Sequence, residues 1–234
     1  MGNKRCVIIG GAQIADYERI REYLDKEDYY IFCDGGLRHR KGLGAVPDLI
    51  VGDFDSFENP REPGIETIVL PRRKDDTDSV YAVKEGLRRG FDDFLLAGVT
   101  GERLDHTLAN VSILLMLDTA GKKARIVDDY SEMEIVSSSP AYIDESFPYF
   151  SLLNISGTAR GVNIGNAKFP LQDGEITCEY QYAVSNEVLP GKTARVSVGE
   201  GRLLLIRVRK EQRRTEITEN PEQDAEMAGT EQNL

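Results

Sequence analysis

Short apolar runs alternate with segments of helical periodicity through the first half of the chain. Each run ends at or near a glycine, a proline or an acidic residue, which is the pattern of a buried strand followed by a turn. Such runs occupy residues 5–9, 29–33, 48–51, 67–70, 93–96 and 124–127. Apolar positions at helical spacing occupy residues 16–25, 78–89 and 104–119. Strands that alternate with helices predict an α/β domain built on a mostly parallel sheet.

The pattern changes near residues 137–140, which read Ser-Ser-Ser-Pro. Beyond them, short runs rich in β-branched and aromatic residues are separated by turn residues, and these runs occupy residues 149–155, 174–182, 193–198 and 202–208. Such a pattern predicts a small antiparallel sandwich or barrel. The predicted fold class is therefore α/β, with an N-terminal, mostly parallel α/β sheet domain and a C-terminal antiparallel β-sandwich domain.

We place the two predicted domains at residues 1–138 and 139–210. The remaining segment, residues 211–234, holds seven acids, two arginines and few apolar residues. A segment of this composition buries too little apolar surface to fold, so we expect a disordered acidic tail.

The charge of the chain narrows the classes of partner. The 234 residues carry a formal net charge of −11, which disfavours a nucleic-acid-binding protein because such proteins usually present a basic face. A nucleotide substrate stays compatible with this charge, because Mg²⁺ bridges carboxylates to phosphates. No stretch approaches the roughly eighteen apolar residues of a membrane-spanning helix, and the apolar run at residues 6–9 is too short for a signal peptide. We therefore expect a cytoplasmic protein with neither a membrane nor a nucleic-acid partner.

An acidic pair follows the predicted strand at residues 48–51. Asp53 and Asp55 are two positions apart, so on an extended segment their side chains point the same way and can approach one Mg²⁺. The alternative is a turn whose acids cap the next helix or face water. Two further polar blocks at the same predicted sheet edge favour metal binding.

The second block, Asp75-Asp76-Thr77-Asp78, precedes a predicted helix. Asp76 or Thr77 suits the N-cap, and a helix N-terminus also binds phosphate. We favour Asp78 as a metal ligand and interpret Asp75 as solvated.

The third block runs from Gly98 to His106 and contains Arg103 and Asp105, again two positions apart. These two residues suit either a phosphate site or a local ion pair, and an exposed ion pair contributes little stability. Neither a GxGxxG pattern nor a GxxxxGK[ST] pattern occurs, so a Rossmann dinucleotide site and a P-loop are unsupported.

Four motifs in order resemble thiamine pyrophosphokinase. They are Asp34-Gly35-Gly36, the segment at residues 47–56 (PDLIVGDFDS), Thr77-Asp78 and the segment at residues 101–110 (GERLDHTLAN). Residues 150–153 (FSLL) and 184–187 (VSNE) extend the similarity, which covers roughly residues 5–209.

The resemblance implies an enzyme in which the hydroxyl of thiamine attacks the β-phosphorus of ATP and AMP leaves. It also implies a homodimer with an α/β catalytic domain and a thiamine-binding β-sandwich. The resemblance further implies the following roles for these positions. Asp53, Asp55 and Asp78 hold Mg²⁺, and Arg103 and Asp105 act at the transferring phosphates and the hydroxyl. Asp34, Gly35, Thr77 and Gly101 bind ATP, and Ser185, Asn186 and Phe169 bind thiamine across the dimer interface.

The chain departs from the family pattern at one place. The family usually has Gly-Leu-Lys followed by Tyr or Trp, whereas this chain has Asn166-Ala167-Lys168-Phe169 and contains no tryptophan. Phe169 can still stack on an aromatic ring. Two rival functions stay open, namely a pyrophosphokinase for another heterocyclic alcohol, such as a pterin, and a non-catalytic thiamine- or nucleotide-binding sensor. The three acids argue against the sensor, because binding alone would not require them.

Overall fold

The computed structural model describes residues 5–54, 63–71, 73, 75–101 and 103–209. The predicted metal ligand Asp55 and the predicted tail at residues 211–234 lie outside these residues. Within the described part of the chain, no helix combines the length and the apolar composition that crossing a bilayer requires.

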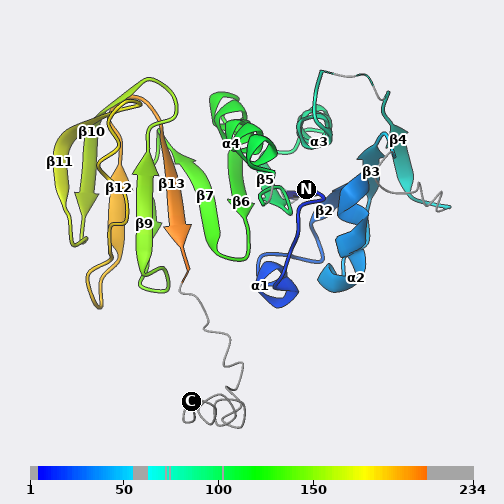
Figure 1. Cartoon of the computed structure of the whole chain (residues 1–234), viewed down its shortest axis with the longest axis horizontal. Coiled ribbons are helices and arrows are strands. Elements are labelled where there is room, and N and C mark those ends of the chain that lie inside the picture. Colours follow the sequence, from blue (N-terminus) through cyan, green and yellow to red (C-terminus); the bar gives the residue numbers. More distant parts are fainter. Residues whose placement is uncertain (1–4, 55–62, 72, 74, 102, 210–234) are drawn as a thin grey trace, which may run out of the picture.

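A nine-stranded sheet forms the centre of the molecule (Figure 1). Its strand order is β4-β3-β2-β1-β5-β6-β7-β13-β9. The first six strands in this order pair in parallel, and they are β4 (Glu66–Val69), β3 (Leu49–Gly52), β2 (Tyr29–Cys33), β1 (Cys6–Ile9), β5 (Asp93–Ala97) and β6 (Lys123–Val127). The last three join antiparallel, and they are β7 (Ser131–Val136), β13 (Leu203–Val208) and β9 (Tyr149–Leu153). The central parallel strands are apolar throughout because both of their faces are covered.

Helices cover both faces of the parallel part. Helices α3 (Asp78–Arg88) and α4 (Leu104–Thr119) pack on one face through a core that includes Val83 and Ile113. Helix α1 (Tyr17–Arg21), the 3₁₀ helix η1 (Asp34–His39) and helix α2 (Arg40–Leu43) pack on the other through Ile20, Leu37 and Leu43. Figure 1 shows α3 and α4 at the top of the view and α1 and α2 at the bottom.

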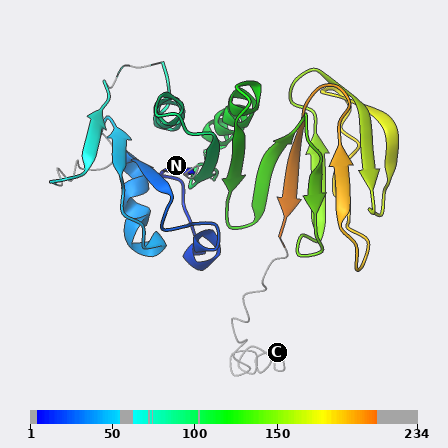
Figure 2. The ribbon, with the colours of Figure 1, turned by 180° about the vertical axis from the view of Figure 1, so that it is seen from behind.

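A four-stranded antiparallel sheet completes the second half. Its order is β11 (Leu171–Thr177), β10 (Thr158–Gly165), β12 (Ala194–Ser197) and β8 (Ala141–Ile143). Residues such as Val162 and Val196 pack against Phe150 and Leu205 of the large sheet and form a sandwich core. Seen from in front or from behind, the β-rich half lies at one end of the long axis and the helices lie towards the other (Figures 1 and 2). The α/β class and the antiparallel sandwich predicted from the sequence are confirmed.

Several local predictions need correction. The helix expected at residues 16–25 ends at Arg21, because Tyr23 and Leu24 turn back to donate to the carbonyls of Ile20 and Arg21. Strand β7 and helices η1 and α2 were not predicted. The domain boundary at residue 138 stays a prediction. Strand β7 precedes this boundary and strand β13 follows it, and the two strands pair over their full length in one sheet.

Candidate active site

An opening at the carboxyl ends of the strands lies where the chain changes direction across the sheet. Strand β1 is followed by β2 on one side, whereas its other neighbour, β5, is followed by β6 on the far side. Open α/β sheets bind ligands at such a switch point. A cavity of about 700 Å³ lies here, lined by the loop after β1, the start of η1, the start of α3 and the segment around Gly98–Gly101.

Close backbone contacts shape the floor of this cavity. A Cβ atom on Gly10 would lie 2.4 Å from the carbonyl oxygen of Gly98, and one on Gly36 would lie 2.1 Å from that of Ile9. Only glycine permits both approaches. The backbone nitrogen of Ala12 then donates to the oxygen of Gly98 at 2.8 Å. The loops after β1, β2 and β5 therefore pack against one another as bare backbone, which leaves room for a ligand above them.

Three carboxylates meet at this edge. One oxygen atom from each of Asp34, Asp53 and Asp78 lies within 4.8 Å of the others. Asp34 follows β2, Asp53 follows β3, and Asp78 begins α3. Carboxylate oxygens are the donors that Mg²⁺ prefers, so this set fits that cation. Of the residues predicted as ligands, the structure brings Asp53 and Asp78 together, and Asp55 lies outside the described residues.

Asp34 was predicted to bind ATP and not to bind metal. Its position in the carboxylate cluster was therefore not predicted from the sequence. It is only 6% exposed, and a Cβ atom on Gly52 would lie 2.5 Å from its own Cβ atom. Its sequence signal matches that of Asp53, because each acid follows an apolar run at the carboxyl end of a strand. The two acids lie close together only because β2 and β3 are neighbours in the sheet.

Three acidic residues near the start of α3, namely Asp75, Asp76 and Asp78, have different surroundings. The hydroxyl oxygen of Thr77 accepts a hydrogen bond from the backbone nitrogen of Val80 at 3.3 Å, so Thr77 is the N-cap. Asp76 turns away and pairs with Lys84 at 2.6 Å. Asp75 is exposed, as predicted. Asp78 alone of the three joins the carboxylate cluster.

Arg103 lines the cavity and contacts Asp105, which is not among the lining residues. Nε and Nη2 of Arg103 donate to the two carboxylate oxygens of Asp105 at 2.9 and 2.6 Å. The guanidinium holds the pKa of Asp105 well below its usual range. Both side chains are exposed, by 70% and 65%, so water weakens the pair and a competing anion can displace it. The neighbouring Gly101 is held by its backbone nitrogen, which donates to the hydroxyl of Thr107 at 3.0 Å.

Sequence reasoning missed two residues beside this cavity, Arg38 and His39. The side chain of His39 is buried and bridges the loop after β1 to helix α1, with Nε2 2.9 Å from the oxygen of Ala12 and Nδ1 2.8 Å from the hydroxyl of Tyr17. Arg38 is exposed and lines the cavity. Their position two and three residues after the Asp34-Gly35-Gly36 motif was the only available signal.

The predicted thiamine residues lie together in the β-rich half. Asn186 is buried, and its side-chain amide bonds the backbone of Phe169 at both ends, at 3.0 and 2.7 Å. It thereby presents the Phe169 ring, which is 59% exposed. Ser185 has a left-handed backbone, with φ of 57°, and its nitrogen donates to Oγ of Ser151 at 3.0 Å. None of these three predicted residues lines the cavity, whose lining includes Asp34 and Asp78.

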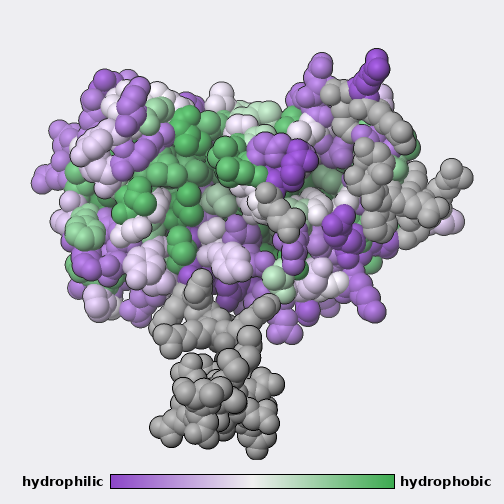
Figure 3. All heavy atoms as spheres, viewed as in Figure 1, coloured by the Kyte–Doolittle hydropathy of each residue, from purple (hydrophilic) through white to green (hydrophobic). Residues whose placement is uncertain are grey.

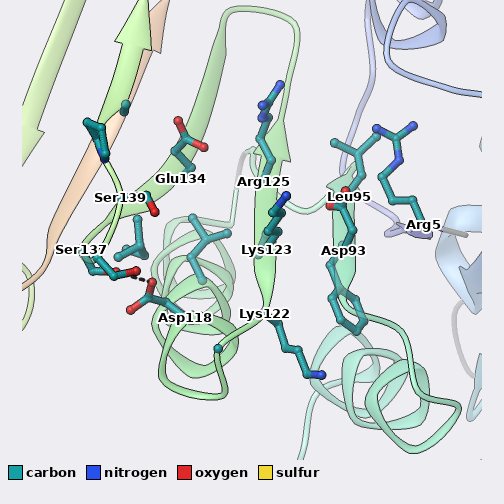
Figure 4. A pocket seen from close by; sticks show the side chains of 18 residues that line it. Arg5, Asp93, Leu95, Asp118, Lys122, Lys123, Arg125, Glu134, Ser137 and Ser139 are labelled. Carbon is teal, nitrogen blue, oxygen red and sulfur yellow. Dashed lines mark hydrogen bonds between the residues drawn. The ribbon is translucent and has the colours of Figure 1, made fainter. Parts of the chain in front are cut away.

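A second cavity of about 570 Å³ lies at the opposite ends of β5 and β6, where Asp93 and Lys123 begin those strands (Figure 4). Several of its charged side chains are paired. Arg125 lies 3.2 Å from Glu132, and Asp118 accepts from Ser137 at 2.7 Å and from Arg202 at 2.6 Å. It contains none of the predicted site residues. The first cavity is therefore the candidate active site.

Comparison with known proteins agrees with this organisation. Two family models match, described as the catalytic domain of thiamin pyrophosphokinase, at residues 20–127, and its vitamin B1 binding domain, at residues 136–203. The thiamine pyrophosphokinase of Bacillus subtilis (strain 168) is 28% identical over 192 residues, which cover 79% of this chain and 89% of that protein.

Solved structures share the fold of this chain. A crystal structure of thiamine pyrophosphokinase from Bacillus subtilis superposes with a TM-score of 0.79 at 24% identity, and covers 89% of this chain and 100% of that one. The enzyme from Geobacillus thermodenitrificans gives a TM-score of 0.76 at 25% identity over 89% of this chain and 99% of that one. Both family models match in the expected order and together span most of the chain, so this chain belongs to the thiamine pyrophosphokinase family.

Proposed function

We propose that this protein transfers a pyrophosphoryl group from ATP to the hydroxyl of thiamine, giving thiamine diphosphate and AMP, at the cavity between β1 and β5. The carboxylate cluster of Asp34, Asp53 and Asp78 is the observation that carries this proposal. It lies at the switch point of the sheet, in a chain with both parts of a thiamine pyrophosphokinase. Neither a pterin pyrophosphokinase nor a sensor is favoured by these matches.

The cluster supports Mg²⁺ as the metal. Asp34, Asp53 and Asp78 would hold the ion, with Asp55 as a further predicted ligand. When bound, Mg²⁺ neutralises charge on the phosphates of ATP and lowers the barrier to phosphoryl transfer. Phosphoryl transfer needs positioning and electrostatic stabilisation more than covalent chemistry, so the remaining residues act mainly by placing the two substrates.

The phosphates would lie between two groups of backbone donors. One is the N-terminus of α3, an eleven-residue helix capped by Thr77, whose dipole favours an anion. The other is the segment around Gly98–Gly101, where Asn110 holds the carbonyl of Val99 at 2.7 Å and thereby fixes the loop. Gly35 and Gly101, both predicted to bind ATP, line the same cavity.

Arg103 and Asp105 suit an exchange of partners. A phosphate that binds the Arg103 guanidinium would displace Asp105, since an exposed ion pair has little net stability to lose. The released carboxylate would then be available to the thiamine hydroxyl. Because its pKa is low, Asp105 is a weak base, and we assign it chiefly to orienting the hydroxyl. A loose transition state needs little help from a base.

A homodimer is supported by an uncovered face of the molecule. Helix α4 buries Ile113 and Leu117 on its inner side, whereas Leu104 and Leu108 on the outer side are 66% and 63% exposed. Large apolar side chains that are exposed together on one side of a helix often mark a protein–protein interface. We propose that a second copy of the chain covers this side.

The outer face of β7, β13 and β9 continues the same surface. Its side chains are mostly apolar and only partly covered, and they include Ile135, Ile206, Leu153 and Val208. Figure 3 shows apolar atoms gathered over these strands and α4. Ser151 lies in the same row as Ile206, and its Oγ holds Ser185. The predicted thiamine residues thus border the proposed dimer interface, which favours a site shared by two copies.

The proposal is tested with purified protein, ATP, Mg²⁺ and thiamine, followed for AMP and thiamine diphosphate. Asp78→Asn should lower turnover at least about 100-fold, because it removes a carboxylate from the cluster. Asp76→Asn is the matched control, since Asp76 is two residues away and pairs with Lys84. The assay also includes a pterin alcohol. Formation of ADP in place of AMP, or preference for the pterin, would refute the proposed reaction.

A further inference from the structure

The cavity contains a cation that the roles assigned above do not use. Two arginines are among the described residues that line it, Arg38 and Arg103. Arg103 is engaged with Asp105 at 2.9 and 2.6 Å. No hydrogen bond or ion pair joins Arg38 to any residue that the structure describes.

The backbone that carries Arg38 is held rigidly. Its neighbour His39 bonds the oxygen of Ala12 at 2.9 Å, and Gly36 packs so closely on Ile9 that no Cβ atom would fit. The side chain of Arg38 is exposed, in contrast to the buried residues on either side of it. A fixed backbone with an uncommitted guanidinium is the arrangement of a preorganised binding group.

The guanidinium of Arg38 lies beside the backbone that follows one of the clustered acids. Nη2 of Arg38 is 3.9 Å from the position that a Cβ atom on Gly35 would occupy. Gly35 directly follows Asp34, whose carboxylate belongs to the cluster. The Arg38 guanidinium therefore lies beside the turn that presents this acid.

The negative charge of the proposed reactants favours a further cation in the cavity. Three carboxylates and the phosphates of ATP bring more negative charge to this cavity than one divalent cation offsets. Guanidinium groups bind phosphates through two parallel hydrogen bonds, and charge-assisted bonds of this kind are about twice as strong as neutral ones.

We propose that Arg38 binds the β- and γ-phosphates of ATP and selects a triphosphate over AMP. This inference rests on the proposed function. It adds to the cavity a specificity-determining cation that comes from η1, on the opposite side of the switch point from Arg103.

The test measures binding of the Mg²⁺ complex of α,β-methylene-ATP to the full chain by calorimetry. Arg38→Met keeps an unbranched stem and removes the charge, and we expect a Kd about 10- to 100-fold weaker, as for the loss of a hydrogen-bonded charged group. Arg38→Lys should recover part of this loss, because it restores the charge without the two-point geometry. The Kd for AMP should stay within about twofold of the wild-type value in both variants.

Lys41→Met is the matched control. Lys41 is an exposed cation on the adjoining helix α2 and does not line the cavity. Its loss should leave analogue binding unchanged, which separates a direct contact from a general change in net charge. Thermal melting of each variant checks that the fold is intact, and Arg38→Gln serves as a second neutral variant if Arg38→Met melts early.

Wild-type affinity for the analogue in folded Arg38→Met would overturn the assignment. An equal loss for AMP would also overturn it, because the guanidinium would then contact the part of the nucleotide that leaves. The experiment contains no thiamine and no turnover. A wild type that binds the analogue but makes no thiamine diphosphate would therefore refute the proposed function and leave the role of Arg38 standing.

Discussion

The imidazole of His39 donates a hydrogen bond from Nε2 to the carbonyl oxygen of Ala12, at 2.9 Å. A carbonyl oxygen only accepts, so the proton must lie on Nε2, and neutral Nδ1 accepts from the hydroxyl of Tyr17 at 2.8 Å. This bridge ties η1 to the loop after β1, and both line the cavity. One neutral histidine therefore helps to fix the mutual position of two walls of the site.

Replacing His39 should loosen this wall. Burial lowers the pKa of His39 below its ordinary value of 6.5. Its contribution to the free energy of unfolding is therefore present above pH 6.5 and is lost as the pH falls below that value, because the unfolded chain then binds the proton more readily. We expect His39→Gln to lower stability by about 1–3 kcal/mol at pH 7.5 and by less at pH 5.5, by chemical denaturation. His106→Gln, at an exposed histidine, is the control, and a difference that grows towards acid would contradict the argument.

A buried carboxylate stabilises the end of α3. Glu85 is 6% exposed and accepts hydrogen bonds from Arg88, at 2.7 and 2.6 Å, and from Arg89, at 2.7 Å. Arg88 first, and then Arg89, lower the pKa of Glu85 to about 2. The stabilisation is present above the ordinary value of 4.5 and is lost as the pH falls towards 2.

We expect Glu85→Gln to lower the free energy of unfolding by about 1–3 kcal/mol at pH 7, with the difference from wild type shrinking at pH 3. Glu66→Gln is the matched control, because Glu66 also pairs with Arg89, at 2.7 Å, but its side chain is 53% exposed. Its cost should stay below about 1 kcal/mol. Equal costs for the two variants, measured by urea titration, would show that burial does not strengthen the Glu85 pairs.

The exposed leucines on the outer side of α4 predict that the protein forms a dimer through this helix. Leu108→Glu places a charge on the apolar surface that we assign to a second copy, so the variant should sediment as a monomer where the wild type sediments as a dimer. Val46→Glu is the control, because Val46 is similarly exposed, at 67%, and lies outside this surface. Analytical ultracentrifugation distinguishes these outcomes. A Leu108→Glu variant that remains dimeric would remove α4 from the interface.

The contacts of Arg209, the last described residue, predict where a C-terminal truncation begins to lower the melting temperature. The Arg209 guanidinium lies 4.9 Å from the ring centre of Phe147 and 5.2 Å from that of Tyr23, and it pairs with Glu132 at 3.2 Å. We expect Arg209→Met to lower the melting temperature by several degrees, because cation–π and ion-pair contacts are lost together. Truncation after Lys210 should leave melting temperature and turnover nearly unchanged. A large drop on truncation would show that residues 211–234 pack on the body.

The sequence by itself determined most strands of the parallel sheet, the start of α3 and two of the acids that meet at one sheet edge. Strands β1, β2, β3, β5 and β6 were predicted because each is an apolar run that ends at a turn residue. The sequence limited the N-cap of α3 to Asp76 or Thr77, and the structure shows that it is Thr77. Asp53 and Asp78 were placed at a common edge because parallel strands present their carboxyl ends on the same side.

Only the tertiary structure decided which of these elements are neighbours. Asp34 joins Asp53 because β2 pairs with β3, and β13 enters the large sheet through β7, from which it is separated by more than sixty residues. His39 reaches Ala12, and Arg38 reaches the cavity, only when η1 packs beside the loop after β1. Periodicity and capping are properties of adjacent residues, so they can be read along the chain. Strand order depends on the total burial that each arrangement of the whole chain allows, and no local pattern encodes it.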